Sequence, residues 1–254
     1  MTADYKNWLP MGMIYGIAGG LFFDLVLIVA VGLASVWGMI FFAIAIILII
    51  ALIWMIMMHR AFSYNGKRKM SKQIIDGIAE YVSIPDGGEC LDVGCGSGAL
   101  TIACAKKNPN AKVLGVDRWG MEYASFSKEL CENNASIEKA TNVSFKRGDA
   151  TKLDFEDETF DVVTSNYVYH NIPSKNRQEL LLETLRTLKK GGTFAIHDIM
   201  SKGRYGDMEA FVARLKDMGY EQVELIDTTD GKFMTKWESI WMELSGSTLL
   251  VGRK

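Results

Sequence analysis

The chain has 254 residues, of which 49% are hydrophobic and 23% charged, and its formal net charge is -2. This length accommodates one large domain or two small ones. The near-neutral charge argues against nucleic acid as the main partner, because phosphate contacts need clustered Lys and Arg. The cysteines, at positions 90, 95, 104 and 131, lack the spacing and companion histidines of a zinc site. We therefore expect no bound metal and no disulfide framework.

The first long segment is almost free of charge. Residues 9–58 contain Asp24 but no other Asp, Glu, Lys or Arg. Such a run is roughly twice the ~20 residues that one membrane-spanning helix needs. We predict two transmembrane helices, at 10–32 and 37–58, joined by a tight turn. A cleaved signal peptide is the alternative, but a second apolar span follows at once and the usual cationic n-region is missing.

A stripe of small residues runs along the first predicted span. Gly12, Gly16 and Gly20 recur every four residues, and Asp24 continues the same register. Close backbone approach at glycine predicts a helix–helix contact along this stripe, with the second span or with a second copy of the chain. Asp24 either makes a structural hydrogen bond there or contacts a polar group of a substrate in the membrane.

Basic residues follow the second span, whereas the predicted turn carries no charge. They include Arg60, the run Lys67-Arg68-Lys69 and Lys72. The positive-inside rule then places both termini and everything after residue 58 in the cytoplasm, in an integral membrane protein. We therefore expect the chain to divide into a transmembrane hairpin at 1–58, a basic linker at 59–72 and a globular domain at 73–254. The linker serves either as a headgroup contact or only as a stop-transfer flank.

From Ser71 onward, the hydrophobic pattern is that of a soluble domain. An amphipathic helix comes first, and strands and helices then alternate, which predicts βαβ units and a mostly parallel sheet. We expect an α/β, seven-stranded sheet with helices on both faces. The predicted strands lie at 89–92, 112–117, 142–147, 160–165, 193–198, 221–227 and 247–252. The predicted helices lie at 98–107, 119–133, 174–189 and 206–218.

The most informative stretch is the glycine-rich loop after the first strand, Asp92-Val93-Gly94-Cys95-Gly96-Ser97-Gly98. Glycine lets backbone N–H groups approach a ligand closely. One interpretation is a dinucleotide site, with Asp117 roughly 20 residues on as its ribose-binding carboxylate. Against this, a nicotinamide-binding strand would normally carry an apolar side chain at Asp92. A buried carboxylate needs a charged partner, which a cationic amino-acid ligand would supply.

Asp92-x-Gly94-x-Gly96-x-Gly98 is similar to motif I of the class I S-adenosylmethionine (SAM) methyltransferases. The resemblance covers the chain from about residue 73 to its end and is nearest to the branch with quinone-biosynthesis and small-molecule enzymes. The segment 185–192 also resembles the family's helix-to-fifth-strand signature, with Lys190 where proline is usual. The resemblance implies a Rossmann-like fold and SAM as the cofactor.

The resemblance also implies which residues hold the cofactor. Asp117 would accept from the ribose hydroxyls, and Arg118 or Trp119 would pack on adenine. Asp149 would accept from the adenine amino group, unless it only caps the turn after its strand. The full set of expected cofactor residues is Asp92, Gly94, Cys95, Gly96, Gly98, Asp117, Arg118, Trp119, Asp149, Ala150, Asn166 and Tyr167.

The acceptor side is expected in the segment 166–171 after the fourth strand. It lacks the Asn-Pro-Pro-Tyr arrangement of enzymes that methylate planar amino groups, which argues against DNA and such protein substrates. Transfer from a sulfonium requires a base only where the nucleophile must lose a proton. His170 is the first candidate, because its unperturbed pKa lies near neutrality. Tyr169 and Asp198, with His197 beside it, are the further catalytic candidates.

Residues 228–246 carry apolar side chains at helical spacing, namely Phe233, Met234, Trp237, Ile240, Trp241 and Leu244. They form either a helix packed on the sheet or an amphipathic cap that meets the membrane. Together these features predict a membrane-anchored methyltransferase with a lipidic or membrane-partitioning acceptor. The alternatives are a tethered enzyme for a soluble thiol, halide or metalloid, and a SAM-binding membrane sensor without turnover.

Overall fold

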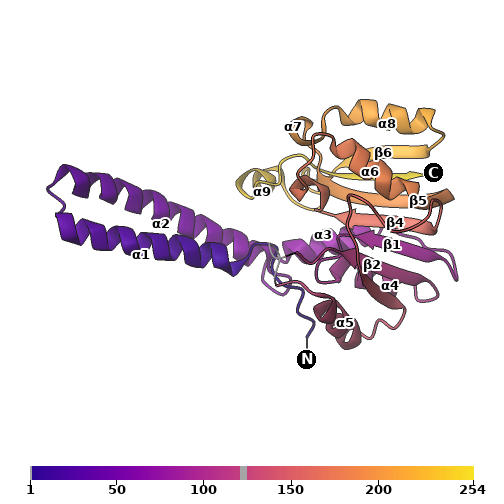
Figure 1. Cartoon of the computed structure of the whole chain (residues 1–254), viewed down its shortest axis with the longest axis horizontal. Coiled ribbons are helices and arrows are strands. Elements are labelled where there is room, and N and C mark those ends of the chain that lie inside the picture. The colour runs from indigo at the N-terminus through magenta and orange to yellow at the C-terminus, as the bar shows by residue number, and fades with distance from the viewer. Residues whose placement is uncertain (1, 121–124) are drawn as a thin grey trace. The chain divides into compact units, whose positions relative to one another are not determined.

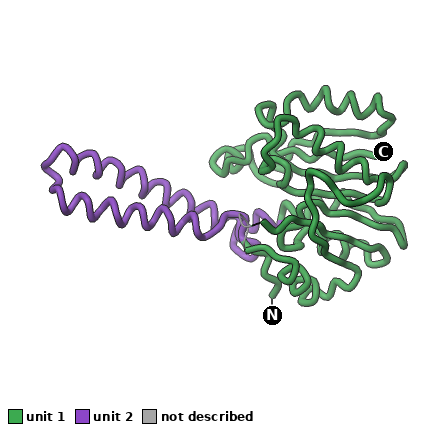
Figure 2. Tube along the Cα trace, in the orientation of Figure 1, with its two compact units in different colours: residues 1–6, 73–254 green, residues 7–72 purple. Residues whose placement is uncertain are grey.

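The computed structural model describes residues 2–120 and 125–254 (Figure 1). The chain divides into two compact units, shown in different colours in Figure 2. The smaller unit is Asn7–Lys72, and the larger one combines residues 1–6 with Gln73–Lys254. The residues before Asn7, which the sequence groups with the hairpin, therefore belong to the larger unit.

The smaller unit is a hairpin of two long helices, α1 (Met11–Val31) and α2 (Val36–Phe62) (Figure 1). Ser35 begins α2 because its hydroxyl accepts a hydrogen bond from the N–H of Gly38 at 2.9 Å. Helix α2 continues four residues past the predicted end at residue 58. By length and composition alone, both helices could cross a membrane.

The glycine stripe does not form the contact between α1 and α2. A Cβ atom added to Gly12, Gly16 or Gly20 would meet no atom of the described chain within 4 Å. Asp24 is buried, and its Oδ2 atom has no hydrogen-bond partner among the described residues. Each four-residue step drifts by about 40°, so Gly12 lies about 120° around the helix from Asp24. The stripe thus makes no close contact with α2 in the described chain, and a contact with a second copy stays a prediction.

The seven strands in the described part of the larger unit form one sheet in the order β3-β2-β1-β4-β5-β7-β6. All pairs are parallel except those of β7, which runs antiparallel to β5 and β6. The chain order reverses between β1 and β4, the place where open α/β sheets bind ligands. The strands are β1 (Glu89–Val93), β2 (Lys112–Asp117), β3 (Val143–Arg147), β4 (Phe160–Asn166), β5 (Leu188–Ile199), β6 (Glu221–Asp227) and β7 (Ser247–Arg253).

Helices cover both faces of this sheet. Leu91 and Val93 pack in one core cluster with side chains of α6 and α8. Asp92 points to the opposite face, where its carboxylate binds Thr101 of α4. The fold class is confirmed. The helices of this unit are α3 (Met70–Ala79), α4 (Ala99–Lys107), α5 (Lys128–Ile137), α6 (Arg177–Arg186), α7 (Lys202–Tyr205), α8 (Met208–Asp217) and α9 (Lys236–Trp241), with a 3-10 turn, η2, at Tyr169–Asn171.

Three predicted helices differ from the observed ones. The helix predicted at 174–189 is α6, Arg177–Arg186, and β5 already begins at Leu188. Helix α5 begins at Lys128 rather than at 119, because the Ser127 hydroxyl caps it by accepting from the N–H of Leu130; part of the predicted range, 121–124, lies outside the described residues. The segment 228–246 is helical only over α9, which a capping box of Thr235 and Glu238 starts. Phe233 is buried ahead of that helix, so the predicted apolar stripe does not lie on one helix face.

Candidate active site

The glycine loop between β1 and α4 needs glycine for two reasons. Gly94, Gly96 and Gly98 have φ values of 75°, 57° and 84°, in the left-handed region that side chains disfavour. In addition, a Cβ at Gly94 would lie 2.1 Å from a methyl group of Val168. The loop therefore packs directly against the segment after β4, which brings the predicted cofactor and acceptor sides together.

Asp92 lies buried beneath this loop. Its two oxygens accept hydrogen bonds from the hydroxyls of Thr101 (2.6 Å) and Thr164 (3.0 Å). Burial raises the pKa of Asp92 to about 7, although these two hydrogen bonds act to lower it. Neither threonine carries a positive charge. A cationic group bound above the loop would stabilise the carboxylate, and the ammonium of SAM fits this requirement.

The loop also offers a backbone donor. Among the peptide N–H groups of residues 94–98, those other than Ser97 bind oxygen atoms of the loop or of β2. The N–H of Ser97 has no partner among the described residues. This N–H is available to an anionic or hydroxyl group of a ligand.

Asp117 ends β2 next to the loop. Its Oδ2 accepts from the N–H of Gly96 and its Oδ1 from the N–H of Trp119, each at 2.8 Å. Each carboxylate oxygen keeps a second lone pair, as ribose hydroxyls require. The indole of Trp119 donates to the carbonyl of Gly96 at 2.9 Å, so this ring is held beside the loop. Arg118 is exposed.

Asp149 follows β3 and is exposed. Its Oδ1 accepts from the N–H and the hydroxyl of Thr151, at 2.8 and 2.7 Å, and these bonds lower the pKa of Asp149. Asp149 thus caps the turn, the alternative that the sequence leaves open. A further role of Asp149 and Ala150 toward adenine stays a prediction.

On the predicted acceptor side, His170 and Asp198 form a hydrogen-bonded pair. Nδ1 of His170 lies 2.5 Å from Oδ1 of Asp198, which is fully buried. Asp198 also accepts from the hydroxyl of Tyr205 at 2.9 Å and the N–H of Ile199 at 2.7 Å. The side chain of His170 remains 14% exposed, at the carboxyl end of the sheet.

The charge of Asp198 decides the tautomer of His170. Burial acts to raise the pKa of Asp198, but the hydrogen bond and charge of His170 and the bonds from Tyr205 and Ile199 outweigh it and hold this pKa below its usual value. An ionised Asp198 can only accept a hydrogen bond, so Nδ1 of His170 carries a proton whether the ring holds one proton or two. The lone pair of neutral His170 is then on Nε2, the nitrogen that makes no hydrogen bond to a described residue.

Two other catalytic candidates are structural in this arrangement. Tyr169 is fully buried, with its hydroxyl 2.5 Å from that of Thr184, so it lies in the core and not at the site. Both ring nitrogens of His197 are bonded, at 2.9 Å, to Asn166 and Thr228. Burial lowers the pKa of His197 to about 3, which keeps it neutral. These contacts argue against a catalytic role for Tyr169 and for His197.

Tyr167 lies between the two histidines. Its N–H donates to the carbonyl of His197 at 2.8 Å, and its hydroxyl lies 2.7 Å from that of Ser247. Its ring is perpendicular to that of His170, with centroids 5.8 Å apart. Its φ of 54° is strained for a tyrosine, which is typical of functional segments. Asn166 and Tyr167 thus line the junction between the predicted cofactor and acceptor sides.

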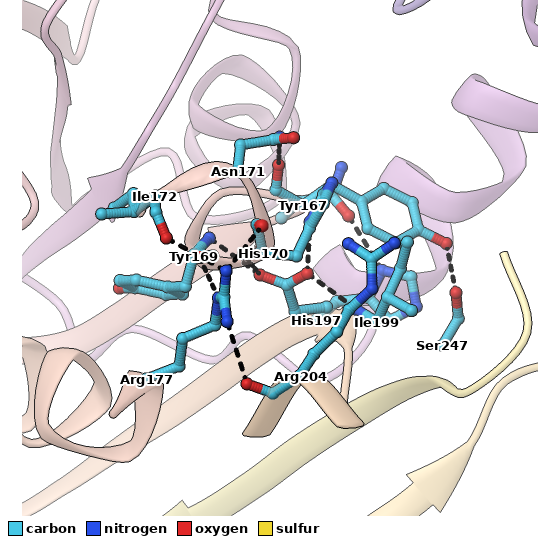
Figure 3. Close-up of polar contacts among 12 residues, drawn as sticks. Tyr167, Tyr169, His170, Asn171, Ile172, Arg177, His197, Ile199, Arg204 and Ser247 are labelled. Atoms are coloured by element: carbon cyan, nitrogen blue, oxygen red, sulfur yellow. Dashed lines mark hydrogen bonds and ion pairs between the residues drawn. The ribbon is translucent and has the colours of Figure 1, made fainter. Parts of the chain in front are cut away.

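Sequence reasoning missed Arg177, at the start of α6. Its guanidinium donates to the carbonyls of Tyr169, His170 and Ile172, at 3.0, 3.3 and 3.2 Å (Figure 3). Arg177 therefore holds the 3-10 turn that carries His170. No local sequence signal marks this role, because the contact depends on how α6 packs back on the turn.

The strand order, the glycine loop at the switch point and the acidic residues Asp92 and Asp117 near the carboxyl ends of β1 and β2 define a class I methyltransferase domain of the SAM-dependent kind. Residues 84–243 match the family model described as "Methyltransferase domain". The match spans more than half of the chain, so the protein belongs to this methyltransferase family.

Two curated relatives are similar to this chain. The demethylmenaquinone methyltransferase of Alkalihalophilus pseudofirmus is 32% identical over 140 residues, which are 54% of this chain and 53% of that protein. The erythromycin 3''-O-methyltransferase of Saccharopolyspora erythraea is 27% identical over 205 residues, 70% of this chain and 64% of that protein. The chain thus matches between about half and two-thirds of the length of these relatives.

Solved structures support the fold. The [4+2]-cyclase SpnF superposes with a TM-score of 0.57 at 17% identity, covering 76% of this chain and 85% of the other. A geranyl diphosphate methyltransferase in complex with GPP and sinefungin gives a TM-score of 0.55 at 13% identity, covering 75% and 82%. At these identities the likeness concerns the fold alone.

Proposed function

We propose that the protein is a membrane-anchored methyltransferase that transfers a methyl group from SAM to a lipidic or membrane-partitioning small molecule. The exposed surface of the hairpin is the observation that carries this proposal. Phe22 and Val29 of α1 are 71% and 84% exposed, and Ile47 of α2 is 65% exposed. So much apolar surface is unfavourable in water and is removed from water in a bilayer. The basic run Lys67-Arg68-Lys69 supports a cytoplasmic location for the larger unit.

The loop residues support SAM as the methyl donor. When bound, SAM supplies an electrophilic methyl group on a sulfonium, which is a good leaving group. Asp92 would offset the positive charge of its ammonium, and the N–H of Ser97 would donate to its carboxylate. Asp117 would accept from the ribose hydroxyls. No other charged side chain is needed for these three contacts.

The histidine–aspartate pair indicates the kind of acceptor. Nε2 of His170 is suited to take a proton from an acceptor hydroxyl or an acidic carbon, and Asp198 then stabilises the imidazolium. The two relatives agree with this chemistry, since one is named an O-methyltransferase and the other a demethylmenaquinone methyltransferase. We infer an acceptor that must lose a proton when it is methylated.

The segment between β6 and β7 supports an apolar acceptor. Phe233 packs against His197, with ring centroids 5.4 Å apart. A few residues later, α9 exposes Trp237 (71%) and Ile240 (56%) beside Lys236. Tryptophan and lysine with aliphatic side chains are typical of the membrane interface. One part of this segment is thus packed in the interior against His197, and another exposes apolar side chains that would suit a bilayer.

The test is a labelled-methyl assay with the full-length protein in lipid nanodiscs. Tritiated SAM is supplied with a membrane lipid extract or with a soluble metabolite extract, and His170→Ala is the inactive control. We expect label in the lipid-soluble fraction, dependent on His170. If label appears only in soluble thiols, halides or metalloids, the proposed lipidic acceptor class is wrong and the acceptor is a soluble small molecule. Retained SAM binding without any labelled product would instead indicate a sensor.

A further inference from the structure

The segment that precedes the hairpin is bound to the larger unit by one buried amide. The N–H of Asp4 donates to Oδ1 of Asn134 at 2.8 Å, and Nδ2 of Asn134 donates to the carbonyl of Asp4 at 3.0 Å. Asn134 is fully buried in α5, and Ala3 and Tyr5 are also buried. The side chain of Asn134 therefore binds the backbone of Asp4 through two hydrogen bonds, although the two residues are 130 positions apart in the chain.

The same amide reaches the glycine loop. Nδ2 of Asn134 also donates to the carbonyl of Ser97 at 3.0 Å, and the hydroxyl of Ser97 donates to the carbonyl of Tyr5 at 3.1 Å. Ser97 is thus held through both its side chain and its carbonyl. The N–H of Ser97 is the loop donor without a partner among the described residues. The bond to the Ser97 carbonyl orients the peptide group that follows Ser97, and this in turn orients the preceding peptide group, whose N–H is available to a ligand.

We propose that residues 3–5 form a strap that completes the SAM site, and that Asn134 is the positioning residue that fastens this strap to the loop. The inference rests on the proposed use of SAM. Held in this way, Ser97 presents its N–H without an ordering cost at the moment of binding. Asn134 need not touch the cofactor itself.

The position of the strap in the chain has a consequence. Tyr5 is held at the loop, and only Lys6 separates it from Asn7, the first residue of the hairpin unit. Within that unit, Nδ2 of Asn7 donates to the carbonyl of His59 at 2.7 Å, and Nδ1 of His59 lies 3.0 Å from the carbonyl of Leu9. In the order of the chain, the hairpin is therefore inserted between the strap and the rest of the larger unit.

The experiment measures the dissociation constants of SAM and S-adenosylhomocysteine for the full-length protein in detergent. The variants are a deletion of residues 2–5 and Asn134→Ala. Asn142→Ala is the matched control, because Nδ2 of Asn142 likewise donates to buried carbonyls, those of Ala105, Asn108 and Ala111, before β3 and away from the loop.

We expect both strap variants to weaken SAM binding about tenfold, as the loss of one or two hydrogen bonds predicts. The kcat at saturating SAM should change less than about twofold, because the strap acts on binding. Asn142→Ala should lower the Tm and leave the dissociation constant unchanged. If Asn134→Ala does not fold, the deletion decides alone.

If the deletion variant has an unchanged dissociation constant for SAM, the strap proposal is overturned. It is also overturned if Asn142→Ala weakens binding as much as Asn134→Ala, since the effect is then one of general stability. These outcomes differ from failure of the proposed function. If the wild-type protein binds no SAM, the proposed cofactor and the strap proposal both fail. If it binds SAM but labels no lipid, only the proposed acceptor class fails.

Discussion

Asp198 binds Nδ1 of His170 at 2.5 Å and lies fully buried beneath the turn that carries this histidine. The carboxylate thereby fixes both the ring orientation and the tautomer. This leaves Nε2 as the basic nitrogen at the partly exposed edge of the ring. In the proposed function, this pair orients His170 to act as a base through Nε2.

We predict that Asp198→Asn and His170→Gln each lower kcat by about 10²–10⁴-fold, the usual range for a general base. An asparagine amide would donate to Nδ1 and place the imidazole proton on Nε2, the wrong nitrogen. SAM affinity should stay within a few-fold of wild type. Because the two residues act as one unit, the double variant should be no slower than the slower single variant. A loss of less than threefold in His170→Gln would exclude a base role.

SAM affinity should depend on pH through Asp92. With its pKa raised to about 7, this carboxyl is protonated below that pH and no longer offsets a bound cation. The dissociation constant should therefore rise about tenfold for each pH unit below 7. In Asp92→Asn, binding should be weaker and this dependence should disappear. Titration calorimetry between pH 5.5 and 8 measures both; identical pH profiles for the two proteins would contradict the prediction.

Stability should respond to pH through Asp92 and His197 with opposite signs. Between pH 3.8, the ordinary aspartate pKa, and about pH 6.5, native Asp92 holds a proton that the unfolded chain releases. The contribution of Asp92 to the free energy of unfolding therefore falls as pH rises. Native His197, with its pKa lowered to about 3, lacks a proton that the unfolded chain binds below pH 6.5. The contribution of His197 to the free energy of unfolding therefore rises with pH. The two terms nearly cancel in the wild type.

Single substitutions should expose each term. His197→Gln should lose about 1.4 kcal/mol of unfolding free energy per pH unit as pH rises from 4.5 to 6, and Asp92→Asn should gain about as much. Urea unfolding in detergent at three pH values gives both slopes. Equal slopes in the two variants would show that other groups control the pH dependence.

The contact between the glycine loop and the segment after β4 can be tested with a pair of glycines. Gly94 and Gly87 both have a φ of 75°, but only at Gly94 would a Cβ meet a side chain, that of Val168. Gly87→Ala should cost only about 1–2 kcal/mol of stability and leave SAM binding intact. Gly94→Ala should abolish measurable binding, with partial recovery when Val168→Ala is added. Equal effects of the two glycine variants would assign the loss to backbone strain alone.

The exposed side chains of α9 should matter only when the acceptor is in a bilayer. We predict that Trp237→Ser with Ile240→Ser raises the KM for a vesicle-borne acceptor at least tenfold, given about 1.5–3 kcal/mol for each buried apolar side chain. Turnover of the same acceptor in detergent micelles should be unchanged. Met218→Ser is the control, because Met218 is a 54% exposed apolar residue after α8. Similar behaviour of this control would argue against a specific membrane contact.

Much of the cofactor side could be predicted from the sequence, because its signals are local. The alternating glycines indicate a loop with positive φ angles, and this signal lies within the loop sequence itself. Asp92 lies only two positions before Gly94, the first of these glycines. The carboxyl ends of parallel strands meet at one edge, so Asp117 could be placed there from the strand alternation alone. The observed bonds between Asp117, Gly96 and Trp119 agree with that placement.

The acceptor side could be predicted only as a segment. Tyr169 and His170 are neighbours in one 3-10 turn, and their side chains point in different directions, one into the core and one to the site. Which of the two is buried depends on Thr184 of α6 and Asp198 of β5, far along the chain. The same holds for Arg177, whose contacts arise from helix packing.

The sequence by itself determined the class of fold, the cofactor loop and the two apolar helices, because periodicity, glycine spacing and continuous hydrophobicity are properties of short segments. Only the tertiary structure decided that Gly12 makes no close contact with α2, that Tyr169 and His197 are buried whereas His170 is partly exposed, and that residues 3–5 belong to the larger unit. Each of these depends on side chains that meet across long separations, such as Asp4 and Asn134. Such pairings are set by the packing of the whole domain and leave no periodic trace in the chain.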